Sequence, residues 1–144
     1  MDLGTGCGII AITLAMERHS WKIEGLDIQP HLIELAKYNA ELCSLNIKFH
    51  LANLCTFTAE TPYTLILSNP PWQPLGTGKI SPYPSKNISH FELLCSLPDI
   101  LSFLVRNLAP EGDALLLYPD FRIFELQTLI PKTPLDIFDL TPCI

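Results

Sequence analysis

A chain of 144 residues with 48% hydrophobic content can bury one sizeable core, but it is too short for a catalytic domain plus a separate recognition domain. No apolar run approaches the roughly 20 residues of a membrane helix, and the first residues lack the pattern of a signal peptide, so we expect a cytoplasmic protein. The formal net charge of −6 argues against a nucleic-acid partner, because phosphate binding normally rests on a basic patch.

The chain opens on a glycine-rich turn with the sequence Asp2-Leu3-Gly4-Thr5-Gly6-Cys7-Gly8. Glycines at alternate positions allow sharp turning and close approach of a ligand, and they lead the chain into a helix N-terminus. The glycines alone are also compatible with a dinucleotide site. A carboxylate at Asp2, however, would repel a pyrophosphate and would hold a cationic amino-acid group, such as the one in S-adenosylmethionine.

After this turn, strand-like and helix-like stretches alternate along the chain. The first half contains a helix at residues 8–18, a strand at 22–28, a helix at 30–45 and strands at 47–52 and 63–68. The second half contains a helix at 90–108 interrupted at Pro98, a strand at 114–118, a helix at 121–129 and a strand at 135–140. This βα repeat predicts an α/β fold with a doubly wound, mostly parallel sheet.

Polar residues follow two of these strands. Asp27 lies 19 residues beyond Gly8, where a doubly wound fold places a carboxylate against a ribose hydroxyl; the alternative is a cap for the helix that begins near Pro30. Asn53 follows the next strand, and it is a candidate either for contact with the adenine amine of a cofactor or for a helix or turn cap.

A rigid polar turn, Ser68-Asn69-Pro70-Pro71-Trp72, ends the strand at residues 63–68. The prolines remove two backbone donors, so the local carbonyls and the Asn69 amide oxygen are free to accept hydrogen bonds from the NH2 group of a ligand. Trp72 would cover the flat face of that group, although an ordinary turn after a strand remains an alternative. The loop at 73–89 that follows is long, which favours a functional role.

Taken together, the segments 2–8, 27 and 69–72 resemble the class I S-adenosylmethionine-dependent methyltransferases that methylate planar nitrogens. The resemblance implies a Rossmann-like fold and S-adenosylmethionine as the cofactor. The residues that we assign to catalysis are Asn69, Pro70, Pro71 and Trp72. Those that we assign to cofactor binding are Asp2, Gly4, Thr5, Gly6, Gly8, Asp27, Ile28, Asn53 and Asn69. No metal site is expected.

Within that superfamily, the segment 68–92 resembles the bacterial methyltransferases that modify the exocyclic amine of an adenine beside the anticodon of valine tRNA. The matching residues are Leu75, Gly76, Gly78, Pro82, Pro84 and Lys86. His90 and Phe91 depart from the expected Arg-His before Glu92, which bears on RNA contact more than on methyl transfer. Lys79 and Lys86 are candidates for phosphate contacts, and solvated loop lysines are the alternative.

Two other functions are compatible with these residues. The release-factor glutamine methyltransferases share the Asn-Pro-Pro-aromatic turn, act on a planar amide of a protein, and would tolerate an acidic surface. A truncated, non-catalytic cofactor-binding domain is the third hypothesis. Only Met1 precedes Asp2, so most of the first strand is missing, and the last strand has no antiparallel partner. We therefore expect residues 1–144 to form a single, partial domain truncated at both ends.

The aromatic and sulfur-containing residues outside these motifs are expected to be structural. Trp21 is expected in the core. The five cysteines show no Cys-x-x-Cys spacing, so they indicate neither a disulfide framework nor a zinc site and are expected to be small buried residues.

Overall fold

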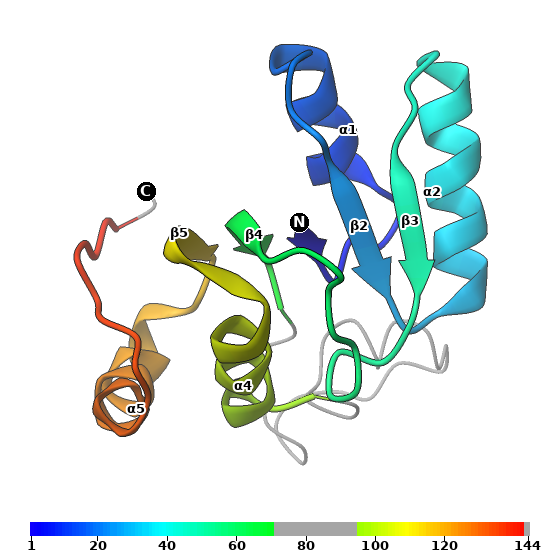
Figure 1. The fold of residues 1–144 in the computed structure, drawn as a ribbon. Coiled ribbons are helices and arrows are strands. Elements are labelled where there is room, and N and C mark those ends of the chain that lie inside the picture. The colour runs from blue at the N-terminus through cyan, green and yellow to red at the C-terminus, as the bar shows by residue number, and fades with distance from the viewer. Residues whose placement is uncertain (71–94, 143–144) are drawn as a thin grey trace.

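The computed structural model describes residues 1–70 and 95–142, which form one five-stranded sheet with helices packed against it (Figure 1). The strand order is β3-β2-β1-β4-β5, and each pairing between neighbouring strands of the described residues is parallel. The strands are β1 (Asp2–Leu3), β2 (Glu24–Asp27), β3 (Lys48–Leu51), β4 (Tyr63–Ser68) and β5 (Leu108–Leu116). The predicted α/β fold with a doubly wound sheet is therefore confirmed.

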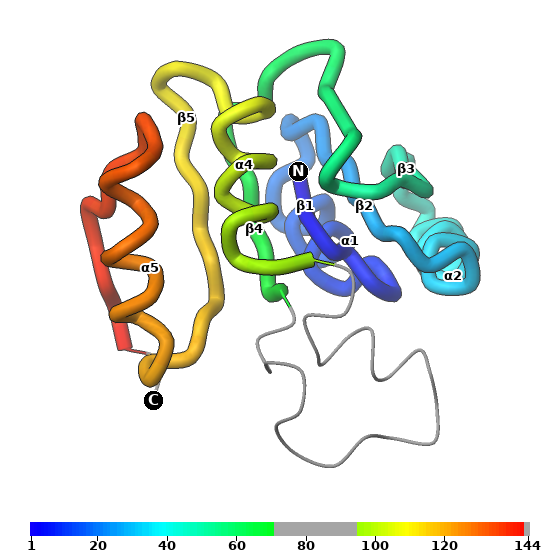
Figure 2. The backbone as a smooth tube through the Cα atoms, turned by 90° about the horizontal axis from the view of Figure 1, so that it is seen from below, coloured from blue at the N-terminus to red at the C-terminus, as the bar shows by residue number. Residues whose placement is uncertain are grey.

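The helices are distributed over both faces of this sheet. They are α1 (Ile9–Glu17), α2 (Pro30–Leu42), α4 (Leu97–Asn107) and α5 (Ile123–Leu129), with short 3-10 turns at Asp120–Arg122 and Ile130–Lys132. Figures 1 and 2 show α1 and α2 beside β2 and β3, α4 next to β4, and α5 beyond β5. Within the described ranges, no helix has the length and apolar content that a membrane crossing needs.

Two apolar clusters correspond to the two faces, because successive side chains of a strand point in opposite directions. Leu3, Leu26 and Ile66 from the three central strands pack in one cluster with α4 and Leu126 of α5. Phe49 of β3 packs in the other cluster with the small and branched residues of α1 and α2. The central strand β1 is only two residues long, but it is hydrogen-bonded between β2 and β4 and both of its residues are buried.

Helix α4 begins at Leu97, and Pro98 lies in its first turn. The prediction that Pro98 interrupts a longer helix is therefore wrong for the described residues. A proline is tolerated in the first turn because the N–H that it lacks has no partner there. Ser96 and Asp99 form a capping box, with the Asp99 carboxylate 2.9 Å from the Ser96 backbone nitrogen, which fixes this start.

The strand expected at residues 135–140 does not form. A strand needs a neighbour for its backbone hydrogen bonds, and no described strand pairs with this run, in which Phe138 is 82% exposed. Trp21 is also not in the core; it is 48% exposed and lies under the Arg18 guanidinium. Among the four described cysteines, Cys43 and Cys55 are exposed and Cys7 and Cys95 are half-buried, so that expectation is wrong as well.

Candidate functional site

The predicted site residues lie where four parallel strands end. The glycine turn follows β1, Asp27 ends β2, Asn53 comes two residues after β3, and Asn69 directly follows β4. The carboxyl ends of parallel strands share one edge of the sheet. The chain leaves β1 toward β2 and β3 and later returns to the other side of β1 as β4, so the topological switch point is between β1 and β4. Open α/β sheets bind their ligands at this position.

The glycine turn adopts a backbone that favours glycine at all three positions. Gly4, Gly6 and Gly8 have φ angles of 74°, 56° and 85°. A Cβ added at Gly4 or Gly6 would meet no atom within 4 Å, whereas one at Gly8 would lie 3.1 Å from the Ala36 Cβ. The first two glycines therefore border open space, and the third is needed for close packing between α1 and α2.

Asp2 lies under this turn and is only 1% exposed. Its Oδ2 accepts hydrogen bonds from the Thr5 hydroxyl at 2.6 Å and from the Ala11 backbone N–H at 3.2 Å. Its Oδ1 is buried, and no described residue donates a hydrogen bond to it. Burial raises the pKa of Asp2 above its ordinary value, against the opposing hydrogen bonds from Thr5 and Ala11. The carboxylate therefore holds the turn with one oxygen and keeps the other without a protein partner.

Asp27 connects β2 to two parts of the site. Its Oδ2 accepts a hydrogen bond from the Gly6 N–H, and its Oδ1 accepts one from the Gln29 N–H, both at 2.9 Å. Asp27 thus contacts the residue that precedes α2 and also orients the glycine turn. Each carboxylate oxygen has two lone pairs, so capacity for a ligand hydroxyl remains. Ile28, the next residue, is half-buried.

Asn53 forms a turn after β3. Its Oδ1 accepts a hydrogen bond from the Cys55 N–H at 2.9 Å, which is the turn-cap geometry weighed above. The Asn53 side chain is exposed, so its amide is accessible to a ligand.

The segment after β4 is described as far as Pro70. Two hydrogen bonds fix Ser68 between its neighbouring strands. Its hydroxyl donates to the Leu3 carbonyl at 2.7 Å, and its backbone carbonyl accepts from the Leu117 N–H. Leu3 and Ser68 are register partners, so Gly4 and Asn69 leave neighbouring strands at the same level. Asn69 is exposed and Pro70 is buried. Pro71, Trp72 and the loop residues predicted to contact RNA lie outside the described residues.

Two supporting residues were not identified from the sequence. Asn39 of α2 donates a hydrogen bond from its amide to the Cys7 carbonyl at 3.0 Å and so ties the glycine turn to that helix. Gly25 of β2 lies so close to Thr5 and Phe49 that an added Cβ would meet their side-chain atoms at 2.7 to 2.8 Å. A glycine inside a strand is a recognised sign of close approach, so Gly25 was identifiable in principle. No sequence pattern distinguishes Asn39 from the other polar residues of α2.

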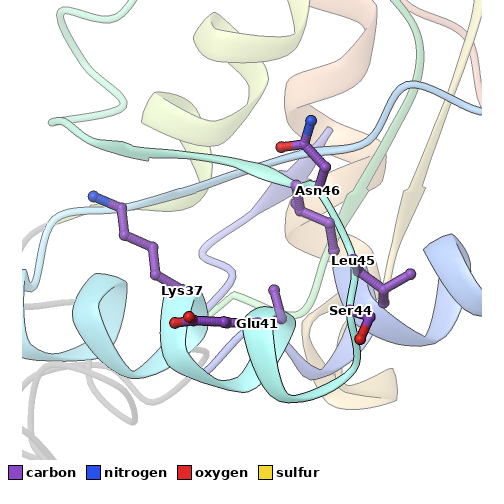
Figure 3. Close-up of a pocket in the computed structure, with 7 residues that line it drawn as sticks. Lys37, Glu41, Ser44, Leu45 and Asn46 are labelled. Atoms are coloured by element: carbon purple, nitrogen blue, oxygen red, sulfur yellow. The ribbon is translucent and has the colours of Figure 1, made fainter.

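The opposite, amino edge of the sheet carries different features. Figure 3 shows a hollow at the end of α2, lined by Lys37, Glu41, Ser44, Leu45 and Asn46. These residues precede β3, so the hollow is remote from the strand ends that carry the site. At this edge Glu24 Oε2 lies 2.7 Å from both His50 Nε2 and the Tyr63 hydroxyl. Burial favours a higher pKa for Glu24, but the two hydrogen bonds, together with the charges of His50 and Lys48, outweigh it and lower the pKa.

Comparison with known proteins agrees with this geometry. Residues 1–79 match the sequence profile of the methyltransferase small domain family. The chain belongs to this family. The predicted resemblance to S-adenosylmethionine-dependent methyltransferases is thereby confirmed.

Relatives from both predicted branches occur. The chain is 36% identical over 74 residues to the release factor glutamine methyltransferase of Bacillus subtilis, a match that covers 50% of this chain and 26% of that protein. It is 31% identical over 114 residues to the tRNA1(Val) (adenine(37)-N6)-methyltransferase of Phocaeicola vulgatus, covering 78% of this chain and 47% of that protein. The chain thus spans between a quarter and a half of the length of these relatives.

Solved structures share the fold. The ribosomal protein L11 methylase of Lactobacillus delbrueckii superposes with a TM-score of 0.65 at 19% identity over 91% of this chain and 57% of that one. A methyltransferase of Thiobacillus denitrificans, solved with S-adenosylhomocysteine, gives a TM-score of 0.56 at 20% identity over 80% of this chain and 39% of that one.

Proposed function

We propose that this chain carries the S-adenosylmethionine site and the methyl-transfer turn of an N-methyltransferase whose substrate is the exocyclic amine of an adenine in tRNA. The observation that carries the proposal is the register between β1 and β4. It brings the glycine turn and the Asn69-Pro70 turn out of adjacent strands at the switch point of the sheet.

The described residues fit the proposed cofactor. Open space at Gly4 and Gly6 would accommodate its amino-acid portion, and the unpartnered Oδ1 of Asp2 would attract that portion's ammonium group, directly or through water. Asp27 would accept hydrogen bonds from the ribose hydroxyls. S-adenosylmethionine, when bound, supplies an electrophilic methyl group with a thioether as its leaving group.

The protein would act mainly by alignment and charge stabilisation. The Asn69 side-chain oxygen and the Pro70 carbonyl would accept hydrogen bonds from the two N–H groups of the substrate amine. These bonds direct the nitrogen lone pair, which is otherwise delocalised into the ring, toward the methyl group. They also share the positive charge that develops on the nitrogen. Trp72 would hold the base flat once it has left its stack.

One long match supports tRNA over a protein substrate, although the match to the tRNA enzyme of Glaesserella parasuis covers 74 residues, as does that to the release-factor enzyme of Bacillus subtilis. The match to the Phocaeicola vulgatus tRNA enzyme continues for 114 residues, beyond the 79 residues of the family domain. The match to the Bacillus subtilis release-factor enzyme covers 74 residues. Glutamine methylation is the second candidate, because a planar primary amide presents the same donors as an adenine amine and the net charge of −6 suits a protein substrate better.

Transfer of a radiolabelled methyl group tests the proposal. The chain is incubated with labelled S-adenosylmethionine and either unmodified valine tRNA or a purified peptide-chain release factor, and the products are digested and identified. Label in N6-methyladenosine supports the proposal, and label in methylglutamine supports the second candidate. If the chain binds S-adenosylhomocysteine but transfers label to neither substrate, the non-catalytic alternative is favoured.

A further inference from the structure

The segment at residues 52–59 connects β3 to β4 and carries Asn53 at the edge of the site, yet it contains neither helix nor strand. Such a segment needs anchors from elsewhere if it is to present a side chain in one place. Local turn bonds supply part of this, since the Asn53 carbonyl accepts from the Phe57 N–H at 2.9 Å.

The last turn of α4 supplies the other anchors of this segment through two adjacent residues, Arg106 and Asn107. The Arg106 guanidinium donates hydrogen bonds to the Leu54 carbonyl at 2.8 Å and to the Cys55 carbonyl at 3.2 Å, and its other terminal nitrogen donates to the Ser102 hydroxyl at 2.9 Å. These bonds hold the two residues directly after Asn53. The planar guanidinium suits this task because it presents several donors in a fixed geometry.

Asn107 anchors the far end of the same segment. It is fully buried, its Oδ1 accepts a hydrogen bond from the Ala59 N–H at 2.7 Å, and its amide also donates to the Phe103 carbonyl of its own helix at 3.0 Å. Between the two anchors, the Phe57 ring stacks on Phe103 of α4 at 6.0 Å. Asn107 and Phe57 fix the middle and far end of the segment, and the Ala52 N–H donates to the Asp27 carbonyl at 3.1 Å just before Asn53. Arg106 is the side chain of α4 that holds the backbone directly after Asn53.

We propose that Arg106 is a positioning residue for recognition of the adenine moiety of the cofactor, acting through the backbone that it holds beside Asn53. The inference rests on the proposed function and on the assignment of Asn53, made from the sequence, to the adenine amine of the cofactor. Arg106 itself is exposed and is argued to act only through Leu54 and Cys55. Its loss should therefore affect discrimination at the adenine amine rather than folding.

The test compares two ligands on the full chain: S-adenosylhomocysteine, and the analogue in which hypoxanthine replaces adenine so that an oxygen replaces the amine. Calorimetry gives both dissociation constants for the wild type, Arg106→Ala, Arg106→Lys and Arg18→Ala. Arg18 is the matched control, since it is an exposed arginine at the end of α1 whose guanidinium lies near the Glu17 carbonyl and the Trp21 ring, away from the segment at residues 52–59.

We expect the wild type to prefer the adenine ligand and Arg106→Ala to lose about tenfold of that preference, the effect of roughly one hydrogen bond. Arg106→Lys should recover part of the preference, and Arg18→Ala should keep it. Equal weakening of both ligands by Arg106→Ala would overturn the positioning role, as would a wild type that binds both ligands equally. A folded wild type that binds neither would overturn the proposed function together with this inference.

Discussion

At the amino edge of the sheet, Glu24 accepts hydrogen bonds from both His50 and Tyr63, and its pKa is lowered. At the carboxyl edge, Asp2 is more deeply buried, one of its oxygens has no donor among the described residues, and its pKa is raised. The two carboxylates belong to neighbouring strands of one small sheet. The amino edge satisfies its half-buried carboxylate, whereas the carboxyl edge leaves its buried carboxylate partly unsatisfied and also carries three glycines at positive φ.

This difference indicates which edge is adapted to a ligand. Buried polar groups without partners and strained backbone lower the stability of the free protein, and they cluster where a ligand completes the structure. A purely structural turn would gain by satisfying Asp2. We therefore expect substitutions at the carboxyl edge to separate binding or turnover from stability, and substitutions at the amino edge to affect stability alone.

The largest expected effect is on turnover. Asn69→Ala should lower kcat by about 100- to 1,000-fold, because it removes the proposed acceptor for the substrate amine, on which positive charge would develop. Affinity for S-adenosylhomocysteine should change little, since the glycine turn and Asp27 remain. Methyl-transfer kinetics and calorimetry measure the two quantities. If turnover and cofactor affinity fall together, Asn69 does not have the assigned role.

Substitution of two glycines in the turn after β1 should give the next largest effect, which is on the free energy of unfolding. Gly8→Ala combines a left-handed backbone with a clash against Ala36 and should cost about 3 kcal/mol. Gly4→Ala adds a Cβ in open space and should cost about 1 kcal/mol, yet it should weaken S-adenosylhomocysteine binding if that space holds the ligand as proposed. Urea unfolding and calorimetry check both. Unchanged affinity in Gly4→Ala would place the cofactor elsewhere.

Asp2→Asn should raise the free energy of unfolding at pH 7, whereas the two glycine substitutions lower it. The folded state of the wild type holds the Asp2 proton more tightly than the unfolded state, whose pKa is near 3.8. The contribution of Asp2 to the free energy of unfolding is therefore most favourable below pH 3.8, and it is lost as the pH rises through the raised pKa of the folded state. At pH 7 the neutral amide should be more stable by on the order of 1 kcal/mol, while cofactor affinity falls. A stability loss in urea unfolding at pH 7 would contradict this.

Glu24→Gln should have the smallest effect and should be confined to stability. The folded pKa lies below the ordinary value of 4.5, so the contribution of the ionised group is fully present above pH 4.5 and is lost as the pH falls through the folded pKa. At pH 7 the substitution should cost about 1 kcal/mol, and the difference from the wild type should narrow in acid. Equal differences at pH 7 and in acid would argue against the ionised Glu24 as their source.

The parts of the molecule that follow local rules were predictable. The βα alternation located β2, β3, β4 and α2, and the glycine and Asn-Pro turns appear at the strand ends where the motifs placed them. The expected strand at residues 135–140 shows the limit of such rules, because a short run rich in apolar residues indicates a strand whether or not a neighbour exists to pair with it. Pro98 was misinterpreted for a related reason, since the cap formed by Ser96 decides whether a proline starts or breaks a helix.

Long-range polar contacts were not predictable from the sequence. Arg106 meets the Leu54 carbonyl across 52 residues, and Tyr63 meets Glu24 across 39. Neither pair belongs to a motif. The first depends on how α4 packs against the segment after β3, and the second on how β2 and β4 lie in the sheet. The Asp2 Oδ1 atom is a similar case: the motif indicated a carboxylate, but only the packing of Thr5 and Ala11 around it shows which oxygen has no donor among the described residues.

The most direct test of this account is a calorimetric titration of the 144-residue chain with S-adenosylhomocysteine, alongside Asp27→Ala and Glu24→Gln. Circular dichroism of each variant confirms that it is folded. We predict micromolar binding by the wild type and by Glu24→Gln at the amino edge, and loss of binding in Asp27→Ala. Absence of binding by the folded wild type, or equal weakening by both substitutions, would contradict the claim that the carboxyl edge is the cofactor site.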